Sequence, residues 1–203
     1  MFCVKVLLIG SSGVVGSAAA TALVEAGCEL LCASRSGELS VDATDEQSIR
    51  ALFEQVGEVD AVVCAAGAVP FKPLAERSRD DFVTGYLGKA QSQIDLVQLG
   101  TPYVRDGGSF TLTTGILARE PIRTGVAASA ANGAVEAFVM AAACELPRGL
   151  RINAVSPSVL ADAPAYHSAF PGFEPVSSHS VGQLFVKSVL GVQTGRVFDL
   201  DRP

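Results

Sequence analysis

Near the start of the chain, three glycines recur at intervals of three residues in the segment Gly10-Ser11-Ser12-Gly13-Val14-Val15-Gly16. Glycines let a diphosphate approach the backbone closely, and the N-terminus of a following helix presents N–H donors and a positive dipole end to it. Gly16, on that helix, permits tight packing against the preceding strand. An apolar run at 4–9 precedes the turn and a helical segment at 14–26 follows it, so we expect a dinucleotide site rather than an ordinary tight turn.

The elements around this turn indicate an α/β domain. Strands are expected at residues 4–9, 29–34, 59–65, 109–113, 151–155 and 196–200, and helices at 14–26, 45–56, 79–104, 125–146 and 181–190. The strands are apolar runs rather than alternating ones, which is typical of a parallel sheet buried on both faces. We therefore expect residues 1–203 to form a single-domain Rossmann-like doubly wound parallel sheet with helices on both faces. The proline-rich residues 157–180 are expected to form a short lid beside the site.

Further motifs match a known family. Cys64-Ala65-Ala66-Gly67 keeps the Ala-Gly of an Asn-Asn-Ala-Gly motif, and the segment 151–157 (RINAVSP) matches the strand and turn at the nicotinamide end. Together with the glycine-rich turn, their order and spacing resemble the short-chain dehydrogenase/reductase family along almost the whole chain. Ser158 departs from the pattern, because a glycine usually follows Pro157, and the chain is shorter than usual members. The resemblance implies a nicotinamide cofactor and a small-molecule substrate.

The same resemblance distributes the cofactor contacts along the chain. It implies that these residues bind the cofactor: Gly10, Ser11, Ser12, Gly13, Val14, Gly16, Ser34, Arg35, Asp42, Ala43, Ala65, Ala66, Gly67, Lys89, Pro157 and Val159. Arg35 ends the second strand, where the family contacts the adenosine ribose. A guanidinium suits a 2′-phosphate, whereas an acidic residue would favour a free 2′-hydroxyl, and none occurs at 33–36. We therefore expect NADP rather than NAD; the alternative is that Arg35 is a solvated surface residue.

The family's acid–base pair is missing. Members use a Tyr to transfer the proton, and a Lys to lower the pKa of that Tyr and hold the nicotinamide ribose. Matching Ala134-Val135-Glu136 to the helix after the lysine places Ala128 at the Tyr position and Asn132 at the Lys position. No Tyr or Lys occurs between Tyr103 and Tyr166, so a small shift of alignment does not restore the pair.

Three residues are the predicted catalytic replacements: Thr114, Lys89 and Asn132. The Thr114 hydroxyl takes the position of the family's substrate-binding Ser, with Thr113 as the neighbouring candidate, unless these hydroxyls only satisfy backbone groups. Asn132 keeps a hydrogen bond for a ribose but carries no charge. Lys89 falls at the position of the family's Asn and would bind the ribose, or donate a proton if burial lowers its pKa. The alternative is that Lys89 is solvated on a helix face.

Two residues of the lid are the remaining proton-donor candidates. Tyr166 and His167 lie in its proline-rich part, and His titrates near neutral pH. The competing reading, incidental polar residues of a mobile loop, is favoured for both. His179 is expected to cap or flank the next helix.

The composition limits which binding partners and which cellular compartment are expected. The net charge is −6 and no basic cluster occurs, which argues against nucleic acid. The five cysteines form no CxxC pair, so we expect small buried hydrophobes in a reduced compartment and no metal site. No apolar stretch is long enough to cross a bilayer without interruption by glycine or charge, and no export signal is evident. A cytoplasmic protein is expected.

Two functions remain open at this point. One is an NADP(H)-dependent oxidoreductase acting on a small carbonyl or alcohol with a non-standard proton donor. The other is a catalytically impaired NADP(H)-binding sensor or assembly protein. In either case the helices at 79–104 and 125–147 correspond to the family's four-helix interface, so we expect a homodimer or homotetramer.

Overall fold

The computed structural model describes residues 3–202, which form one seven-stranded sheet. The strands are β1 (Lys5–Ile9), β2 (Glu29–Ser34), β3 (Leu39–Ser40), β4 (Val59–Cys64), β5 (Val104–Thr113), β6 (Arg151–Pro157) and β7 (Arg196–Leu200). Their order is β3-β2-β1-β4-β5-β6-β7, and every neighbouring pair is parallel. The direction of winding reverses between β1 and β4, and ligands of such sheets bind at that switch point. The predicted doubly wound sheet is confirmed.

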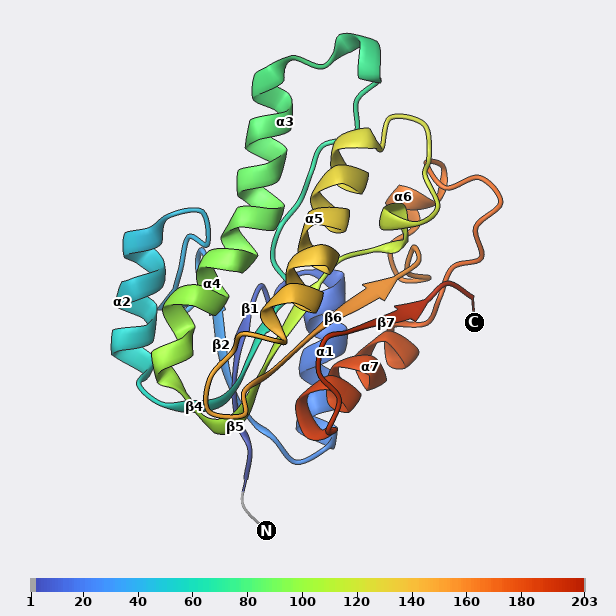
Figure 1. Cartoon of the computed structure of the whole chain (residues 1–203). Coiled ribbons are helices and arrows are strands. Elements are labelled where there is room, and N and C mark those ends of the chain that lie inside the picture. Colours follow the sequence, from blue (N-terminus) through green and yellow to red (C-terminus); the bar gives the residue numbers. More distant parts are fainter. Residues whose placement is uncertain (1–2, 203) are drawn as a thin grey trace.

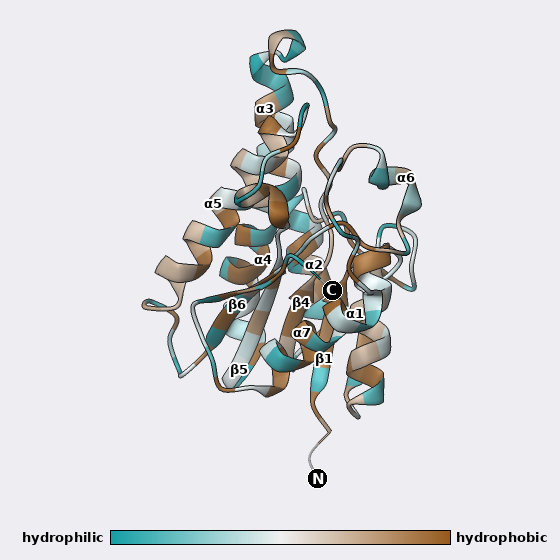
Figure 2. Cartoon of the chain, turned by 90° about the vertical axis from the view of Figure 1, so that its right-hand side faces the viewer, coloured by the Kyte–Doolittle hydropathy of each residue, from teal (hydrophilic) through white to brown (hydrophobic). Residues whose placement is uncertain are grey.

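Helices cover both faces of the sheet (Figure 1). One face carries α1 (Val14–Glu25) and α7 (Ser178–Leu190), and the other carries α2 (Glu46–Val56), α4 (Ser92–Gly100) and α5 (Val126–Ala142). Each face of the sheet has its own hydrophobic core, and alternate residues of β1 pack into the two cores. Val6 and Leu8 pack toward α1 and α7, while Leu7 and Ile9 pack toward α2, α4 and α5. The apolar strands lie between the two helix layers in Figure 2, as burial on both faces requires.

The long helix expected at 79–104 is interrupted. It comprises α3 (Arg79–Tyr86), a π-helical turn at Leu87–Gln91 and α4, which ends at Gly100. Pro102 explains the early end, because it has no N–H to donate and the chain tightens into a 3₁₀ turn at Thr101–Tyr103. In Figure 1, α3 extends beyond the end of the sheet that lies opposite the N-terminus.

A side-chain bridge holds the π-helical turn against the sheet. Gln93 is fully buried, and its Nε2 donates to the carbonyl oxygens of Lys89 and Thr113, both at 3.0 Å. Its Oε1 accepts from the Thr113 N–H at 2.8 Å. The carbonyl of Lys89 therefore has a fixed partner on α4, and the position of Lys89 is tied to the end of β5.

The proline-rich segment at 157–180, expected to act as a lid and called the lid below, contains structure that its composition did not indicate. It holds the short helix α6 (Pro164–His167), and Leu160 pairs with Val176 in a bridge. The expected lid boundary at 180 is too late, because α7 begins at Ser178. The cap of α7 is Ser177, whose Oγ accepts from the Ser180 N–H at 3.0 Å, so His179 flanks the cap from within the first turn.

The five cysteines differ in their burial. Cys28 and Cys64 are buried, as predicted, but Cys3, Cys32 and Cys144 are exposed, so burial of the cysteines is wrong for these three. The side chains of these three cysteines face solvent, and an apolar run in the sequence does not predict which of its residues are exposed. Within residues 3–202 no helix is long and apolar enough to cross a bilayer, and no group of three or more His, Cys, Asp or Glu is placed to hold a metal ion.

Candidate functional site

The glycine-rich turn between β1 and α1 has room only for glycine at its key positions. Gly10 has a φ of +84°, and a Cβ there would lie 2.7 Å from the Ala66 nitrogen. A Cβ on Gly16 would overlap the Gly10 carbonyl oxygen. The turn therefore packs directly on the residues after β4 and on the first turn of α1. No side chain caps α1, so its first N–H groups remain available to an anion.

A cavity of about 470 Å³, called the first cavity below, opens beside this turn. It brings together ten of the residues predicted to bind the cofactor: Gly10, Ser12, Gly13, Ser34, Arg35, Asp42, Ala43, Ala65, Ala66 and Gly67. These residues come from the ends of β1, β2 and β4 and from the segment after β3. Ser11 and Gly16 do not line it, and Gly16 acts through the close packing described above.

Arg35 and Asp42 face the first cavity with opposite charges. Asp42 Oδ1 accepts hydrogen bonds from the Thr44 hydroxyl at 2.7 Å and the Thr44 N–H at 2.9 Å, and these bonds lower the pKa of the carboxyl. Arg35 is exposed, and among residues 3–202 no side-chain hydrogen bond or ion pair engages its guanidinium. A free guanidinium beside a fixed carboxylate can receive a phosphate while the carboxylate accepts an amino group.

A second cavity, of about 340 Å³, lies under the lid. Its lining includes four of the predicted residues, Val14, Asn132, Pro157 and Val159, together with Gly13, Ala65 and Gly67 from the first cavity. Ser158 also lines it, and its Oγ is buried with no hydrogen-bond partner among the described residues.

The end of β5 presents a glycine, not a hydroxyl, to the second cavity. A Cβ built on Gly115 would lie 3.6 Å from Asn132 Nδ2 and 3.6 Å from the Pro157 carbonyl oxygen. The Thr114 hydroxyl instead donates to Glu136 Oε1 at 2.9 Å, and the Thr113 hydroxyl donates to the Cys64 carbonyl at 2.7 Å. Both hydroxyls are engaged within the protein and neither residue lines the cavity, so a catalytic role for Thr114 stays a prediction.

Glu136 is the centre of a polar network that the sequence did not suggest. Besides Thr114, its Oε1 accepts from Ser156 Oγ at 3.0 Å and from Arg119 Nη1 at 3.2 Å. Arg119 Nη2 also pairs with Asp201 at 2.7 Å. The network joins α5, the ends of β5 and β6 and the C-terminal segment behind the wall of the second cavity. Its members lie far apart in sequence, so no local pattern reveals them.

Lys89 is buried at the junction of the two cavities rather than solvated. The residue is 9% exposed, and its side chain packs under Gly67, which lines both cavities. Desolvation lowers the pKa of Lys89 from the ordinary 10.5 to about 8, with Cys64 acting in the opposite direction. Among residues 3–202 no hydrogen bond or ion pair engages its Nζ, and this atom is not completely sealed from solvent. Lys89 lines neither cavity directly, so its contact with a ligand stays a prediction.

The residue at the expected Lys position lines the second cavity, whereas the residue at the expected Tyr position packs in an apolar cluster beside it. Asn132 is part of its lining, and Ala128 packs in the apolar cluster that includes Ile116 and Phe170. Of the two lid candidates, Tyr166 lines the cavity and is 55% exposed. His167 does not line it; its Nε2 lies 2.9 Å from the Leu160 carbonyl and holds the lid together.

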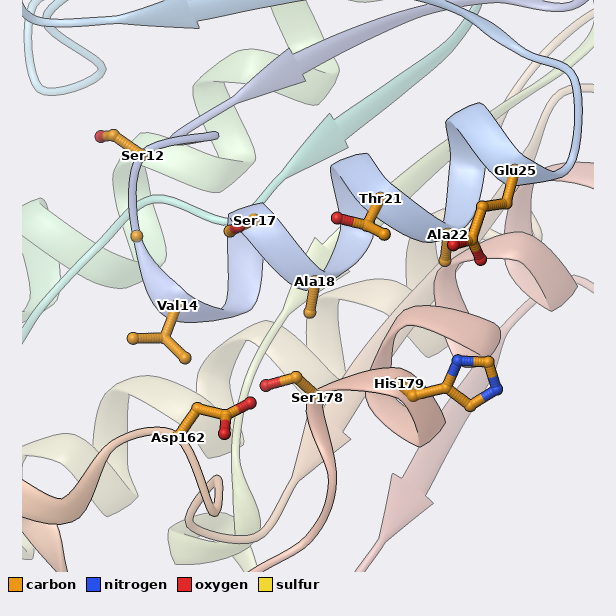
Figure 3. A pocket seen from close by; sticks show the side chains of 11 residues that line it. Ser12, Val14, Ser17, Ala18, Thr21, Ala22, Glu25, Asp162, Ser178 and His179 are labelled. Atoms are coloured by element: carbon orange, nitrogen blue, oxygen red, sulfur yellow. The ribbon is translucent and has the colours of Figure 1, made fainter.

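A third cavity, of about 450 Å³, lies between α1 and α7 (Figure 3). Its side chains include Asp162 from the lid and Ser178 and His179 from α7, which face α1 across the hollow. Gly13 lines all three cavities, so the glycine-rich turn is the point where they meet.

Comparison with known proteins agrees with this geometry. The family model described as Enoyl-(Acyl carrier protein) reductase matches residues 10–193, from the glycine-rich turn to the segment before β7. The chain belongs to the short-chain dehydrogenase/reductase family of oxidoreductases.

Several relatives of this short-chain dehydrogenase/reductase are known. The crystal structure of the protein lin1944 from Listeria innocua is 45% identical, with a TM-score of 0.95, and covers 98% of this chain and 100% of that one. A small-chain dehydrogenase crystallised in complex with NADPH has the same fold, at 24% identity and a TM-score of 0.87, covering 98% and 97% of the two chains. Hydroxynaphthalene reductase arp2 of Aspergillus fumigatus is 26% identical over 125 residues, which are 59% of this chain and 46% of that protein. The chain spans about half the length of the curated relatives that it matches.

Proposed function

We propose that this protein is an NADP(H)-dependent oxidoreductase that binds the cofactor across the first and second cavities and acts on a small carbonyl or alcohol. One observation carries the cofactor assignment: the glycine cradle and the free guanidinium of Arg35 lie in the same cavity. A dinucleotide diphosphate fits a turn in which Gly10 and Gly16 exclude any side chain. The 2′-phosphate that distinguishes NADP fits the unpaired Arg35.

The remaining cofactor contacts follow from the order of residues along the two cavities. Among residues 3–202 no hydrogen bond reaches Asp42 Oδ2, which would accept from the adenine amino group. Val14, Pro157 and Val159 line the second cavity, where the nicotinamide end would lie. A small-chain dehydrogenase of the same fold was crystallised in complex with NADPH, which supports this cofactor as the ligand.

When bound, the reduced cofactor supplies a hydride to the carbonyl carbon, whose oxygen then takes up one proton. Asn132 has an amide on the cavity wall that would hold the nicotinamide ribose or the substrate oxygen. Lys89, with a pKa of about 8, retains its proton at pH 7 and would bind the ribose hydroxyls or return a proton to the oxygen. The lid and the apolar residues of the wall would limit the access of water to the reacting atoms.

A second function is favoured by one feature of the same cavity. Gly115, Ala128 and Asn132 stand where a hydroxyl, a phenol and an ammonium are expected, so Tyr166 of the lid is the one ionisable side chain among the described residues of the lining. A protein that binds NADP(H) as a sensor or assembly partner would have this composition. Hydride transfer still requires only that cofactor and substrate be held in reactive geometry, so the reaction would be slower rather than abolished.

The deciding experiment is turnover with a panel of uncharged and charged carbonyl compounds, followed at the nicotinamide absorbance. The oxidoreductase assignment predicts NADPH oxidation with at least one class, and a loss of at least tenfold in Lys89→Met. Lys187→Met makes the same chemical change at an exposed site on α7 and should retain full activity. Tight NADPH binding without oxidation across the panel would establish the sensor function instead.

We also propose that the protein is a homo-oligomer joined through α4 and α5. A hollow of about 410 Å³ lies between these helices, with Ile94, Phe138 and Leu146 in its lining, and Met140 is 57% exposed nearby on α5. Phe138→Glu would place a charge in this apolar surface and is expected to shift the protein to a monomer in light-scattering measurements of mass. A mass of one chain in the unmutated protein would contradict the proposal.

A further inference from the structure

The second cavity has a wall without charge. Among its seventeen lining residues none is Asp, Glu, Lys or Arg, and the polar side chains are Asn132, Ser158 and Tyr166. Three charged residues close to the cavity do not line it: Lys89 packs under Gly67, Glu136 is paired with Arg119, and Asp162 lines the third cavity. A charged ligand entering this cavity would lose hydration and find no opposite charge among these residues.

Aromatic rings from two separate segments meet at this cavity. Phe71 follows β4, whereas Tyr166 and Phe170 belong to the lid. The Phe71 ring lies edge-to-face with Tyr166 at a centroid distance of 6.4 Å and with Phe170 at 6.1 Å. Phe170 packs edge-to-face on Phe173 at 5.5 Å, which supports it from outside. These four residues are called the aromatic cluster below.

The expected Tyr position holds a small apolar residue beside the aromatic cluster. Ala128 packs in the same apolar group as Ile116, Leu117, Val159 and Phe170. Tyr166 is more than half exposed although it lines the cavity, so much of its ring surface remains available for a ligand.

The lid that carries Tyr166 and Phe170 is held by contacts of its own. Leu160 is bridged to Val176, the Ala161 N–H donates to the Val176 carbonyl at 2.8 Å, and His167 Nε2 lies 2.9 Å from the Leu160 carbonyl. A cavity whose walls are held in this way favours ligands that match its shape.

We infer that the second cavity selects uncharged aromatic carbonyl compounds, or their alcohols, and that Phe71 and Phe170 determine this selectivity. This inference rests on the proposed oxidoreductase function for its chemistry, but binding alone tests the cavity. Edge-to-face packing of a ligand ring on an aromatic side chain is worth about threefold to tenfold in affinity beyond the apolar area it buries.

The test is calorimetric titration of the full chain, with and without saturating NADP⁺, using three matched probes. 2-Naphthol is uncharged and aromatic, decahydro-2-naphthol is its saturated counterpart, and 2-naphthoate carries a negative charge. We expect 2-naphthol to bind at least threefold more tightly than decahydro-2-naphthol and at least tenfold more tightly than 2-naphthoate. Equal affinity for 2-naphthol and either counterpart, or no binding of 2-naphthol, would overturn the inference.

Variants identify the rings responsible. Phe71→Leu and Phe170→Leu keep an apolar side chain, so that folding is retained, and remove the ring. Each should lower the affinity for 2-naphthol threefold to tenfold while leaving that for decahydro-2-naphthol unchanged. Val192→Ala, at a site that is 90% exposed beyond α7, is the matched control and should change neither affinity. Equal losses for both probes would indicate a structural role only and contradict the assignment.

The design separates this inference from the cofactor assignment. If NADP⁺ fails to bind, the proposed function is wrong, while the preference among the three probes in the cofactor-free protein still tests the aromatic cavity. If NADP⁺ binds and the probes are not distinguished, the aromatic selectivity alone is wrong.

Discussion

Replacing Lys89 by methionine should stabilise the protein at pH 7. The lysine is buried under Gly67 without a hydrogen-bond partner among the described residues, and desolvation lowers its pKa from 10.5 to about 8. Methionine has a similar length and no charge to desolvate. The folded protein therefore carries a cost at Lys89 that the variant lacks, and a ligand that pairs with the ammonium would offset the same cost.

The size of this effect follows from the pKa. A shift of about 2.5 units at about 1.36 kcal/mol per unit corresponds to about 3 kcal/mol. Between pH 8 and 10.5 the unfolded chain binds a proton at Lys89 that the folded chain does not, so this residue makes stability rise with pH in that window. Below pH 8 the full cost is present. At pH 10 only about 1 kcal/mol of it remains.

The assay is urea unfolding followed by circular dichroism, at pH 7 and pH 10, for the unmutated chain, Lys89→Met and Lys187→Met. The reasoning predicts that Lys89→Met is more stable at pH 7 by about 3 kcal/mol, less any difference in packing, and that the gain shrinks by about 2 kcal/mol at pH 10. Lys187→Met controls for the loss of one positive charge from the molecule, although it also removes the contact of Lys187 Nζ with the Phe198 ring at 4.7 Å and is therefore expected to be slightly less stable than the unmutated chain. A Lys89→Met gain that is absent at pH 7, or that does not shrink at pH 10, would refute the reasoning.

Two further predictions concern the wall of the second cavity. Glu136→Ala should lower the free energy of unfolding by about 2 kcal/mol, because the Thr114 hydroxyl and Arg119 lose their acceptor. Glu136→Gln keeps an acceptor oxygen, so its free energy of unfolding should fall by less. Equal losses for the two variants in urea unfolding would contradict the proposed network. Gly115→Ser would add a hydroxyl facing Asn132, where the backbone is extended and a Cβ has room. It should raise carbonyl turnover about tenfold; an unchanged rate would show that the missing hydroxyl is not limiting.

The sheet and its order of elements could be predicted from sequence because the signals are local. Apolar runs of strand length alternate with helical segments, and the glycine-rich turn marks the first crossover. The elements that were missed are short or depend on distant partners. β3 has two residues and α6 four, which is too few for any period to appear. The π-helical turn depends on Gln93 reaching Thr113, a contact between two elements.

The site divides in the same way. The residues of the first cavity lie in motifs at strand ends, so their assembly could be predicted. The direction of a side chain at the end of β5 could not, because it depends on register: Thr113 points to Cys64, Thr114 points to Glu136, and Gly115 faces the cavity. Phe71 and Phe170 carry no motif, and only the packing of the lid on the segment after β4 brings their rings together.

The most direct test of the cofactor assignment is calorimetric titration of the purified protein and its Arg35→Leu variant with NADPH and NADH. The glycine cradle predicts that both cofactors bind. The unpaired guanidinium predicts that NADPH binds at least tenfold more tightly, as a charge-assisted contact of about 1.5–3 kcal/mol would produce, and that Arg35→Leu removes the difference. Failure to bind either nucleotide, or a preference for NADPH that survives loss of Arg35, would contradict the account.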